Sequence, residues 1–268
     1  MLKYDFNRGI FMLAIERRKK IYEYLHENGS ATVIELKALF DVGEETIRRD
    51  LTKMEEEGLL QRTYGGAFLD EGKHLVLPDK VRETVHIKEK TLIGTLCVDL
   101  IQSGDTIFLD GSTTCQYIAK AILYKKNLIV ITNAMKIALT LSKAPNIKVI
   151  FIGGTMRHNT LTCVGHTSKK LIKEYFADKA FICCDGIHQN NGITDANEQE
   201  AEIRTSMLTQ TEQRILVADR TKFDKTSFKK IGEISDLDYL VTDKQLSETW
   251  IKKLDESNVK IICVKTEI

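Results

Sequence analysis

Seven short apolar runs rich in β-branched residues recur through the last two thirds of the chain, and they limit its possible folds more than any other feature. Helix-compatible segments lie between most of them. Apolar strands that alternate with helices favour a largely parallel sheet covered on both faces, because parallel strands need crossover connections that bury both sides. The sequence therefore predicts an α/β domain with strands at residues 106–109, 128–132, 148–152, 179–184, 215–218, 239–242 and 260–264.

A polar segment separates this α/β domain from the N-terminal part of the chain. Residues 70–88 carry no clear hydrophobic period and contain Pro78, one of only two prolines, which is typical of a linker. We therefore expect an N-terminal domain at residues 12–70, a linker at 71–88 and the α/β domain at 89–268. Residues 1–11 form an N-terminal extension.

The composition is that of a globular protein. Hydrophobic residues make up 43% of the chain and charged residues 29%, which supplies a core and excludes wholesale disorder. No stretch approaches the roughly 18 consecutive apolar residues of a membrane helix. The first residues also lack the basic-then-apolar order of a signal peptide. We expect a soluble, cytoplasmic protein that does not bind a membrane.

Neither the charge nor the metal-binding residue types identify a partner. The net charge is +1, so any binding of nucleic acid must come from a local patch. The six cysteines form no C-x-x-C pair and the six histidines form no H-x-x-x-H pair. We interpret the cysteines as reduced, mostly buried thiols, and we expect neither a metal nor a cofactor.

The N-terminal domain has the pattern of three helices and a hairpin. Hydrophobic spacing predicts helices at residues 15–28, 32–41 and 44–57, and Thr32 with Glu35 forms a capping-box signature at the second. The basic residues 17–20 fall on the polar side of the first helix. Gly58 closes the third helix, and a Gly-Gly turn lies between β-prone runs within residues 59–69. This order is typical of a winged helix-turn-helix.

The third helix and the hairpin carry the candidate DNA contacts. Ile47, Leu51 and Met54 form the apolar stripe of the helix, and Arg49 lies opposite them. An arginine on a helix in the major groove can donate two hydrogen bonds to a guanine, while neighbouring polar residues reach phosphates. On an isolated helix, the preferred interpretation would be a solvated charged face. The candidates are Thr46, Arg48, Arg49, Lys53, Arg62, Tyr64, Gly65 and Gly66.

These segments resemble the DNA-binding domain of the DeoR family of bacterial transcriptional regulators. The resemblance rests on RRKKIYEYL and on ENGSATVIELKALFDVGEETIRRDLTKMEEEGLLQRTYGGA, in particular T-I-R-R-D-L, G-L-L-x-R and G-G-A. The family usually has serine at Gly43 and histidine at Tyr64. Met12 resembles the family's usual start, so residues 1–11 are either an arm or a misassigned start. The resemblance implies a double-stranded DNA operator and a homo-oligomer, either a dimer or a tetramer.

Polar residues follow five of the predicted strands, at the carboxyl ends where parallel sheets bind ligands. The first strand runs into Asp110-Gly-Ser-Thr-Thr at a helix start, a pattern that suits a phosphate. Arg157 and Lys222 also suit a phosphate, whereas Asn133 and Asp185 suit sugar hydroxyls, as Asp110 does. Each such strand end is equally compatible with an ordinary turn. The candidates are Asp110, Gly111, Ser112, Thr113, Thr114, Thr132, Asn133, Gly153, Gly154, Arg157, Asp185, Gly186, Glu200 and Lys222.

The α/β domain is similar to the DeoR sensor domain. The matching pieces are I-F-L-D-G-S-T-T, I-T-N-A, F-I-G-G-T, F-A-D-K-A-F-I, G-I-T, Glu200-Ala201 and V-A-D-R-T-K-F. Gly111 precedes Ser112 here, whereas the family commonly has the reverse order. The resemblance implies a fold shared with ribose-5-phosphate isomerase and CoA transferases, and a phosphorylated sugar as effector. We therefore expect a repressor of a sugar or carbohydrate operon whose DNA affinity the effector changes.

Two alternatives remain open at this point. The first is a sugar-phosphate isomerase with an appended DNA-binding domain, in which Asp110, Asp185, Glu200 and Lys222 would move protons. The DNA-binding domain makes sensing the simpler use of the site, so we expect no enzymatic activity. The second alternative is a DNA-binding protein whose α/β domain no longer binds any ligand.

Overall fold

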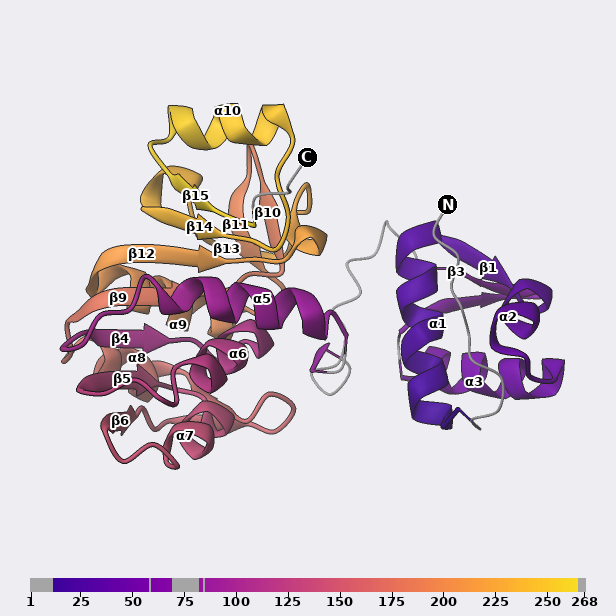
Figure 1. Cartoon of the computed structure of the whole chain (residues 1–268), viewed down its shortest axis with the longest axis horizontal. Coiled ribbons are helices and arrows are strands. Elements are labelled where there is room, and N and C mark those ends of the chain that lie inside the picture. Colours follow the sequence, from indigo (N-terminus) through magenta and orange to yellow (C-terminus); the bar gives the residue numbers. More distant parts are fainter. Residues whose placement is uncertain (1–11, 58, 69–81, 84, 265–268) are drawn as a thin grey trace. The chain divides into compact units, whose positions relative to one another are not determined.

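The computed structural model describes residues 12–57, 59–68, 82–83 and 85–264. The chain divides into two compact units, Met1–Val85 and His86–Ile268 (Figure 1). The proposed N-terminal extension, Gly58 and most of the proposed linker lie outside the described residues. Among the residues that the structure describes, no helix has the length and apolar character needed to cross a bilayer.

The three predicted helices of the N-terminal unit are confirmed. They are α1 (Ala14–Asn28), α2 (Val33–Phe40) and α3 (Glu44–Glu56). Gly29 ends α1 with a φ of 77°, a backbone conformation that glycine adopts without steric cost. The capping box at α2 is present, because Thr32 Oγ1 accepts a hydrogen bond from the Glu35 N–H and the Glu35 side chain accepts one from the Thr32 N–H.

A small antiparallel sheet completes this unit, with strands in the order β1-β3-β2. The predicted hairpin is confirmed as β2 (Gln61–Thr63) and β3 (Gly66–Phe68). The third strand, β1 (Ser30–Thr32), was not predicted, because Ser-Ala-Thr contains no apolar run that would indicate a strand. Thr32 both pairs with Gly66 and caps α2, so the hairpin is tied to the start of that helix.

Ile21, Leu25, Leu36 and the apolar stripe of α3 form the buried core of the N-terminal unit. One part of the sequence interpretation is wrong: Arg17 is not on the exposed side of α1. It is buried, and its Nε lies 2.6 Å from Oδ2 of the equally buried Asp50 on α3. A buried carboxylate needs a charged partner, and that requirement overrides the tendency of arginine to stay in water.

All seven predicted strands are present in the C-terminal unit, and they form one parallel sheet in the order β15-β14-β12-β9-β4-β5-β6. Their bounds differ from the predicted runs by at most four residues. The strands are β4 (Thr106–Leu109), β5 (Leu128–Thr132), β6 (Ile147–Phe151), β9 (Ala177–Ile182), β12 (Thr211–Val217), β14 (Tyr239–Val241) and β15 (Lys260–Ile262).

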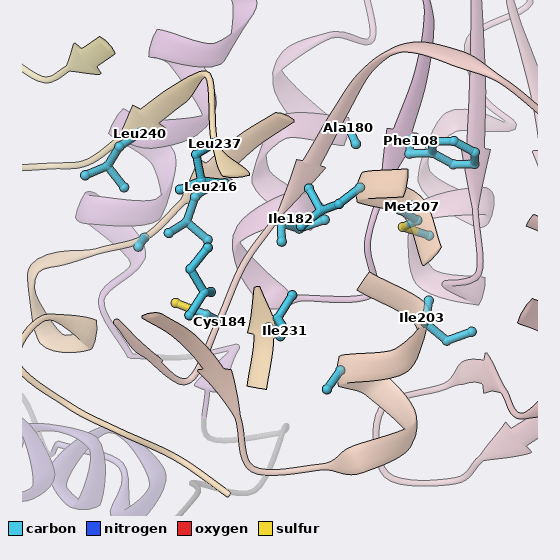
Figure 2. Close-up of a cluster of buried hydrophobic side chains, with 14 of the residues drawn as sticks. Phe108, Ala180, Ile182, Cys184, Ile203, Met207, Leu216, Ile231, Leu237 and Leu240 are labelled. Carbon is cyan, nitrogen blue, oxygen red and sulfur yellow. The ribbon is translucent and has the colours of Figure 1, made fainter. Parts of the chain in front are cut away.

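Helices cover both faces of this sheet, as expected for parallel strands (Figure 1). A first buried cluster joins alternate residues of the strands, such as Ile107, to α5 (Ile87–Val98), α6 (Thr113–Ala121) and α7 (Met135–Leu141). A second cluster occupies the opposite face and includes residues of α8 (His166–Ile172), α9 (Glu198–Thr209) and α10 (Glu248–Glu256). Figure 2 shows Phe108, Ile182 and Leu216 of this second cluster with Ile203 and Met207.

The strand order reverses direction between β4 and β9. The chain builds outward from β4 to β5 and β6, then returns to place β9 on the other side of β4 before continuing outward to β12, β14 and β15. Two small antiparallel sheets, which were not predicted, follow the carboxyl ends of β6, β9 and β12. They consist of β7 (Thr155–Arg157) with β8 (Thr162–Val164), and of β10 (Gly186–His188), β11 (Gly192–Asp195) and β13 (Lys229–Gly232).

Candidate functional site

The face of α3 opposite its buried stripe is open to solvent. Ile47, Leu51 and Met54 are fully buried, while Arg49 and Lys53 are exposed. Thr46 and Arg48, at the two margins of this face, are half-buried. The arrangement therefore offers two cations to a ligand that covers the helix, with a hydroxyl and a further guanidinium beside them.

Arg62 of β2 lies against the same helix. Its Nη1 donates a hydrogen bond of 2.6 Å to Thr52 Oγ1, and its backbone N–H donates one of 2.8 Å to Glu55 Oε1. Thr52 in turn donates to the backbone carbonyl of Arg48. The guanidinium of Arg62 is thus held next to α3 rather than at the tip of the hairpin.

The hairpin turn presents Tyr64, which is the most exposed large apolar side chain described, with a relative exposure of 102%. Gly65 beside it is exposed, and a Cβ added there would meet no atom within 4 Å. Gly66 differs, because it is buried and a Cβ there would lie 2.2 Å from the Ala31 carbonyl oxygen. Gly66 is therefore required for the close approach of β3 to β1.

In the C-terminal unit, Asp110 links β4 and β9, the two strands between which the strand order reverses. Its Oδ1 accepts a hydrogen bond of 3.0 Å from the Ser112 N–H, and its Oδ2 accepts one of 3.0 Å from the Cys183 N–H, just beyond β9. Arg204 of α9 donates to the same Oδ2 at 2.5 Å and also contacts Asp195. Asp110 is only 1% exposed, so its carboxylate is committed to partners within the protein.

The charge of Asp110 is stabilised despite its burial. Burial pushes the pKa of this carboxyl upward, but the Arg204 charge and the hydrogen bonds from Cys183 and Ser112 outweigh burial and hold the pKa below its ordinary value. The pKa of the neighbouring Cys183 thiol shifts in the opposite direction, because burial raises it. All six cysteines lie outside disulfide bonds in the structure, and five of them are buried.

The residues after Asp110 form the N-terminus of α6. Ser112 caps the helix through its Oγ, which accepts a hydrogen bond of 3.1 Å from the Cys115 N–H. Thr113 and Thr114, in the first turn, are buried. Gly111 has no room for a side chain, because a Cβ there would lie 2.1 Å from Thr162 Cγ2. The order Gly111-Ser112 therefore places the glycine where β8 leaves no room for a side chain and the serine where its hydroxyl caps α6.

Asn133 lies directly after β5 and is fully buried. Its Nδ2 donates to the Cys163 carbonyl at 2.9 Å, whereas its Oδ1 has no hydrogen-bond partner among the described residues. Thr132 instead accepts a hydrogen bond from the Ala134 N–H. A buried amide oxygen without a donor is costly, so this atom has spare capacity for a polar ligand.

The two glycines after β6 accommodate the start of α8. Ser168 of that helix donates a hydrogen bond of 2.8 Å to the Gly153 carbonyl. Gly154 has a φ of 154°, and a Cβ there would lie 1.9 Å from Ser168 Oγ. Gly154 is therefore required for close packing against α8, whereas Gly153 contributes its carbonyl, and the β7–β8 hairpin follows beyond the carboxyl end of β6.

Glu200 of α9 gathers polar residues from this hairpin. Its Oε1 accepts hydrogen bonds from Arg157 Nη1 at 2.7 Å and from Thr162 Oγ1 at 2.6 Å, with Thr160 Oγ1 at 3.4 Å. The Glu200 side chain is buried, while that of Arg157 stays one quarter exposed. Arg157 is therefore accessible from solvent although it is paired.

Beyond β9 and β12, Asp185 and Lys222 are brought together, with Asp185 Oδ1 3.6 Å from Lys222 Nζ. Asp185 Oδ2 also accepts a hydrogen bond of 3.2 Å from the Ala196 N–H. Gly186 follows and closely approaches the backbone of Lys225, since a Cβ would lie 2.6 Å from that carbonyl oxygen.

The sequence reasoning missed Arg204, Thr160 and Thr162, which bind the carboxylates that it did select. Glu200 and Arg204 lie one turn apart on α9 and are both buried, and this spacing of charges on an otherwise apolar face was the available signal. Among the described residues, no group of three His, Cys, Asp or Glu side chains is arranged to hold a metal ion.

The sequence matches two protein families in tandem. Residues 17–73 match the DeoR-like helix-turn-helix domain, and residues 85–244 match the DeoR C-terminal sensor domain. Among solved structures, ribose 5-phosphate isomerase A from Neisseria gonorrhoeae is similar over 50% of this chain and 52% of its own, with a TM-score of 0.37 and 12% identity.

Several curated proteins resemble the chain over nearly their whole length. The uncharacterized HTH-type transcriptional regulator YulB of Bacillus subtilis is 38% identical, with 94% of this chain and 98% of the relative covered. The HTH-type transcriptional repressor GlcR of B. subtilis is 32% identical, with 94% and 97% covered. The L-fucose operon activator of Haemophilus influenzae is 30% identical, with 92% and 98% covered.

These three relatives are named for the control of transcription, and none is named as an enzyme. The alternative of an isomerase with an appended DNA-binding domain is therefore not supported. The helix-turn-helix match falls within the N-terminal unit, and the sensor-domain match covers most of the C-terminal unit. The chain belongs to the DeoR family of helix-turn-helix transcriptional regulators.

Proposed function

We propose that the chain represses a sugar or carbohydrate operon by binding its operator through α3 and the β2–β3 wing. The main support is the exposed Arg49, which lies opposite three fully buried apolar residues of α3. Arg49 reads a base in the major groove, and Lys53 with the marginal Thr46 and Arg48 contacts phosphates. Arg62, held beside α3, and the wing tip at Tyr64, Gly65 and Gly66 extend the surface.

Fluorescence anisotropy at fixed salt tests this assignment, with DNA from upstream of the protein's own gene and a scrambled duplex. Arg49→Ala weakens specific binding by about 1–3 kcal/mol and leaves binding to the scrambled duplex nearly unchanged, because a base contact carries sequence information. Lys252→Ala on α10, whose side chain is 79% exposed, is the matched control. An equal loss of affinity on both duplexes would assign Arg49 to the DNA backbone instead.

We also propose that a phosphorylated sugar binds where the sheet reverses direction, at the carboxyl ends of β4, β5, β6, β9 and β12. Ligands of open α/β sheets bind at such a reversal. The α6 N-terminus at Ser112, Thr113 and Thr114 receives the phosphate, assisted by Lys222 and Arg157. The orphaned Oδ1 of Asn133 accepts from a sugar hydroxyl, as does Asp185.

The remaining candidates shape this effector site rather than contact the ligand. Asp110 holds the loop before α6, and Glu200 orients Arg157. Gly111, Gly154 and Gly186 allow close backbone packing, and Gly153 accepts the hydrogen bond from Ser168. Thr132 fixes the turn before α7. We therefore expect substitutions at these positions to lower the stability of the C-terminal unit rather than to remove a direct contact with the ligand.

Calorimetric titration with ribose 5-phosphate, glucose 6-phosphate and fructose 6-phosphate tests the effector site, with each unphosphorylated sugar as a control. Lys222→Gln weakens binding of the phosphorylated sugar by about 1.5–3 kcal/mol, the range for hydrogen bonds to charged groups, and Lys252→Gln leaves it unchanged. Equal affinity for a sugar and its phosphate would contradict the proposed binding of the phosphate by the α6 N-terminus, Lys222 and Arg157.

We propose that the effector lowers DNA affinity and that the repressor is a homodimer or homotetramer. A dimer presents two recognition helices to two half-sites, and a coupling of about 1–3 kcal/mol changes affinity about 5- to 150-fold. Light scattering gives the mass in solution, and anisotropy with saturating effector gives the sign of the coupling. Because one relative is named an activator, tighter DNA binding with effector would replace repression with activation.

A further inference from the structure

The loop after β12 is cross-linked by hydrogen bonds among its own polar groups and to Asp243. Asp219 is buried, and its Oδ1 accepts hydrogen bonds from the N–H and the hydroxyl of Thr221. The Arg220 N–H donates to Asp243 Oδ1 at 2.7 Å, beyond β14. Lys222 ends the loop, and its N–H donates to the Asp219 carbonyl. Lys222 is therefore linked to Asp219 and Thr221 through short-range hydrogen bonds within the loop.

This loop contacts the first turn of α5. Arg220 Nη2 lies 3.7 Å from Glu89 Oε1. His86, the N-cap of α5, lies near Asp219: burial pushes the pKa of Asp219 upward, but the charges of Lys222 and His86 and the Thr221 hydrogen bonds together hold it below its ordinary value. The loop thus has Lys222 at one end and the N-terminus of α5 beside it.

The N-terminus of α5 is continuous with the DNA-binding unit. Val85, the residue before the N-cap His86, is 1% exposed and belongs to the buried apolar cluster of the N-terminal unit. The His86 carbonyl accepts the first hydrogen bond of α5, from the Lys90 N–H at 3.0 Å. One peptide bond therefore joins a core residue of the N-terminal unit to the residue that caps α5 of the C-terminal unit.

We propose that the segment Asp219–Lys222 transmits effector binding to the DNA-binding unit through the Arg220–Glu89 contact, the N-terminus of α5 and Val85. The inference rests on the proposed effector site, because it takes Lys222 as a ligand residue. When Lys222 turns toward a phosphate, Arg220 shifts against Glu89, and α5 passes the shift to Val85 across one peptide bond. Arg220 and Glu89 are positioning residues that do not contact the effector.

Charge reversal of this pair in the full chain is the test. The variants are Arg220→Glu, Glu89→Arg and the double exchange, with Lys252→Glu as the matched exposed control. Calorimetry with ribose 5-phosphate, glucose 6-phosphate and fructose 6-phosphate measures effector affinity. Anisotropy with and without each sugar phosphate measures the ratio of the two DNA dissociation constants. An exposed ion pair changes an equilibrium by up to about fivefold, so we expect each single reversal to lower that ratio about threefold or more.

The expected result is a lower ratio in both single variants, unchanged effector affinity, and recovery of the ratio in the double exchange. Single variants that keep the wild-type ratio would overturn the inference. If no sugar phosphate changes DNA binding of the wild type, the proposed effector is refuted. The transmission route is then tested by comparing the DNA affinities of the wild type and the variants without ligand. Arg220→Glu must then change DNA affinity about threefold, with restoration by Glu89→Arg, and an unchanged affinity refutes the transmission route.

Discussion

Replacing Arg204 with methionine removes the only cation that the structure pairs with both Asp110 and Asp195 in its described part. Methionine keeps most of the side-chain volume, so the charge is the main change. The loss of one partner from a buried ion pair costs about 3–5 kcal/mol, because the other charge stays buried without compensation. At about 2–4 °C per kcal/mol for a unit of this size, the melting temperature falls by roughly 6–20 °C.

The loss of folding stability caused by Arg204→Met is expected to be smaller at low pH than at neutral pH. In the wild type the folded-state pKa of Asp110 is below its ordinary value, so its stabilisation is complete above that ordinary value and is lost as the pH falls through the folded-state pKa. In Arg204→Met, burial becomes the dominant influence and raises the folded-state pKa of Asp110. Protonation then favours the folded state, and the stability deficit is smaller at pH 4.5 than at pH 7.

Urea denaturation followed by tryptophan fluorescence measures this deficit. The single tryptophan, Trp250, is buried on α10, so the signal reports on the C-terminal unit alone. The control is the double variant Asp110→Asn with Arg204→Met, which removes one of the two uncompensated carboxylates, leaves Asp195, and recovers part of the loss. A deficit below about 1 kcal/mol, or one that is equal at both pH values, would refute the reasoning.

Three further predictions concern the N-terminal unit. Gly66→Ala costs about 1–3 kcal/mol, because its Cβ meets the Ala31 carbonyl, whereas Gly65→Ala has open space and shifts thermal denaturation little; equal losses would contradict the close contact. Arg17→Met costs about 3–5 kcal/mol in the same assay, and adding Asp50→Asn recovers part of it; no recovery would mean that the pair is not coupled. Tyr64→Ala keeps stability within about 0.5 kcal/mol but weakens operator binding, and unchanged anisotropy would remove Tyr64 from the interface.

Hydrophobic periodicity was sufficient for the main architecture. Each of the seven parallel strands was identified, because strands such as β4 and β5 are buried on both faces and read as continuous apolar runs. The short strands of the two small sheets, and β1, were missed. These segments lack the continuous apolar run that marked the strands of the parallel sheet, and pairing with distant segments, such as Gly66 with Thr32, determines their structure instead.

The sequence selected several polar residues that the structure gathers beyond the carboxyl ends of the sheet, but it did not predict which of them pair with one another. Asp110 and Asn133 were selected because they directly follow apolar strands, β4 and β5. Sequence spacing carries no information on which buried charge meets which, so Arg204 as the partner of Asp110 emerged only from the fold. The same limitation placed Arg17 in solvent, although it pairs with a carboxylate 33 residues away.

The central position of β4 also sets the order in which the protein can fold during synthesis. Ile107 pairs with Val130 on one side, but its partner on the other side, Lys179, is made much later. The sheet therefore cannot close until β9 has left the ribosome, whereas the N-terminal unit depends on nearby segments and folds first. A chain whose translation stops before β9 carries a finished DNA-binding head and a bare strand edge, which makes it prone to pair with other chains.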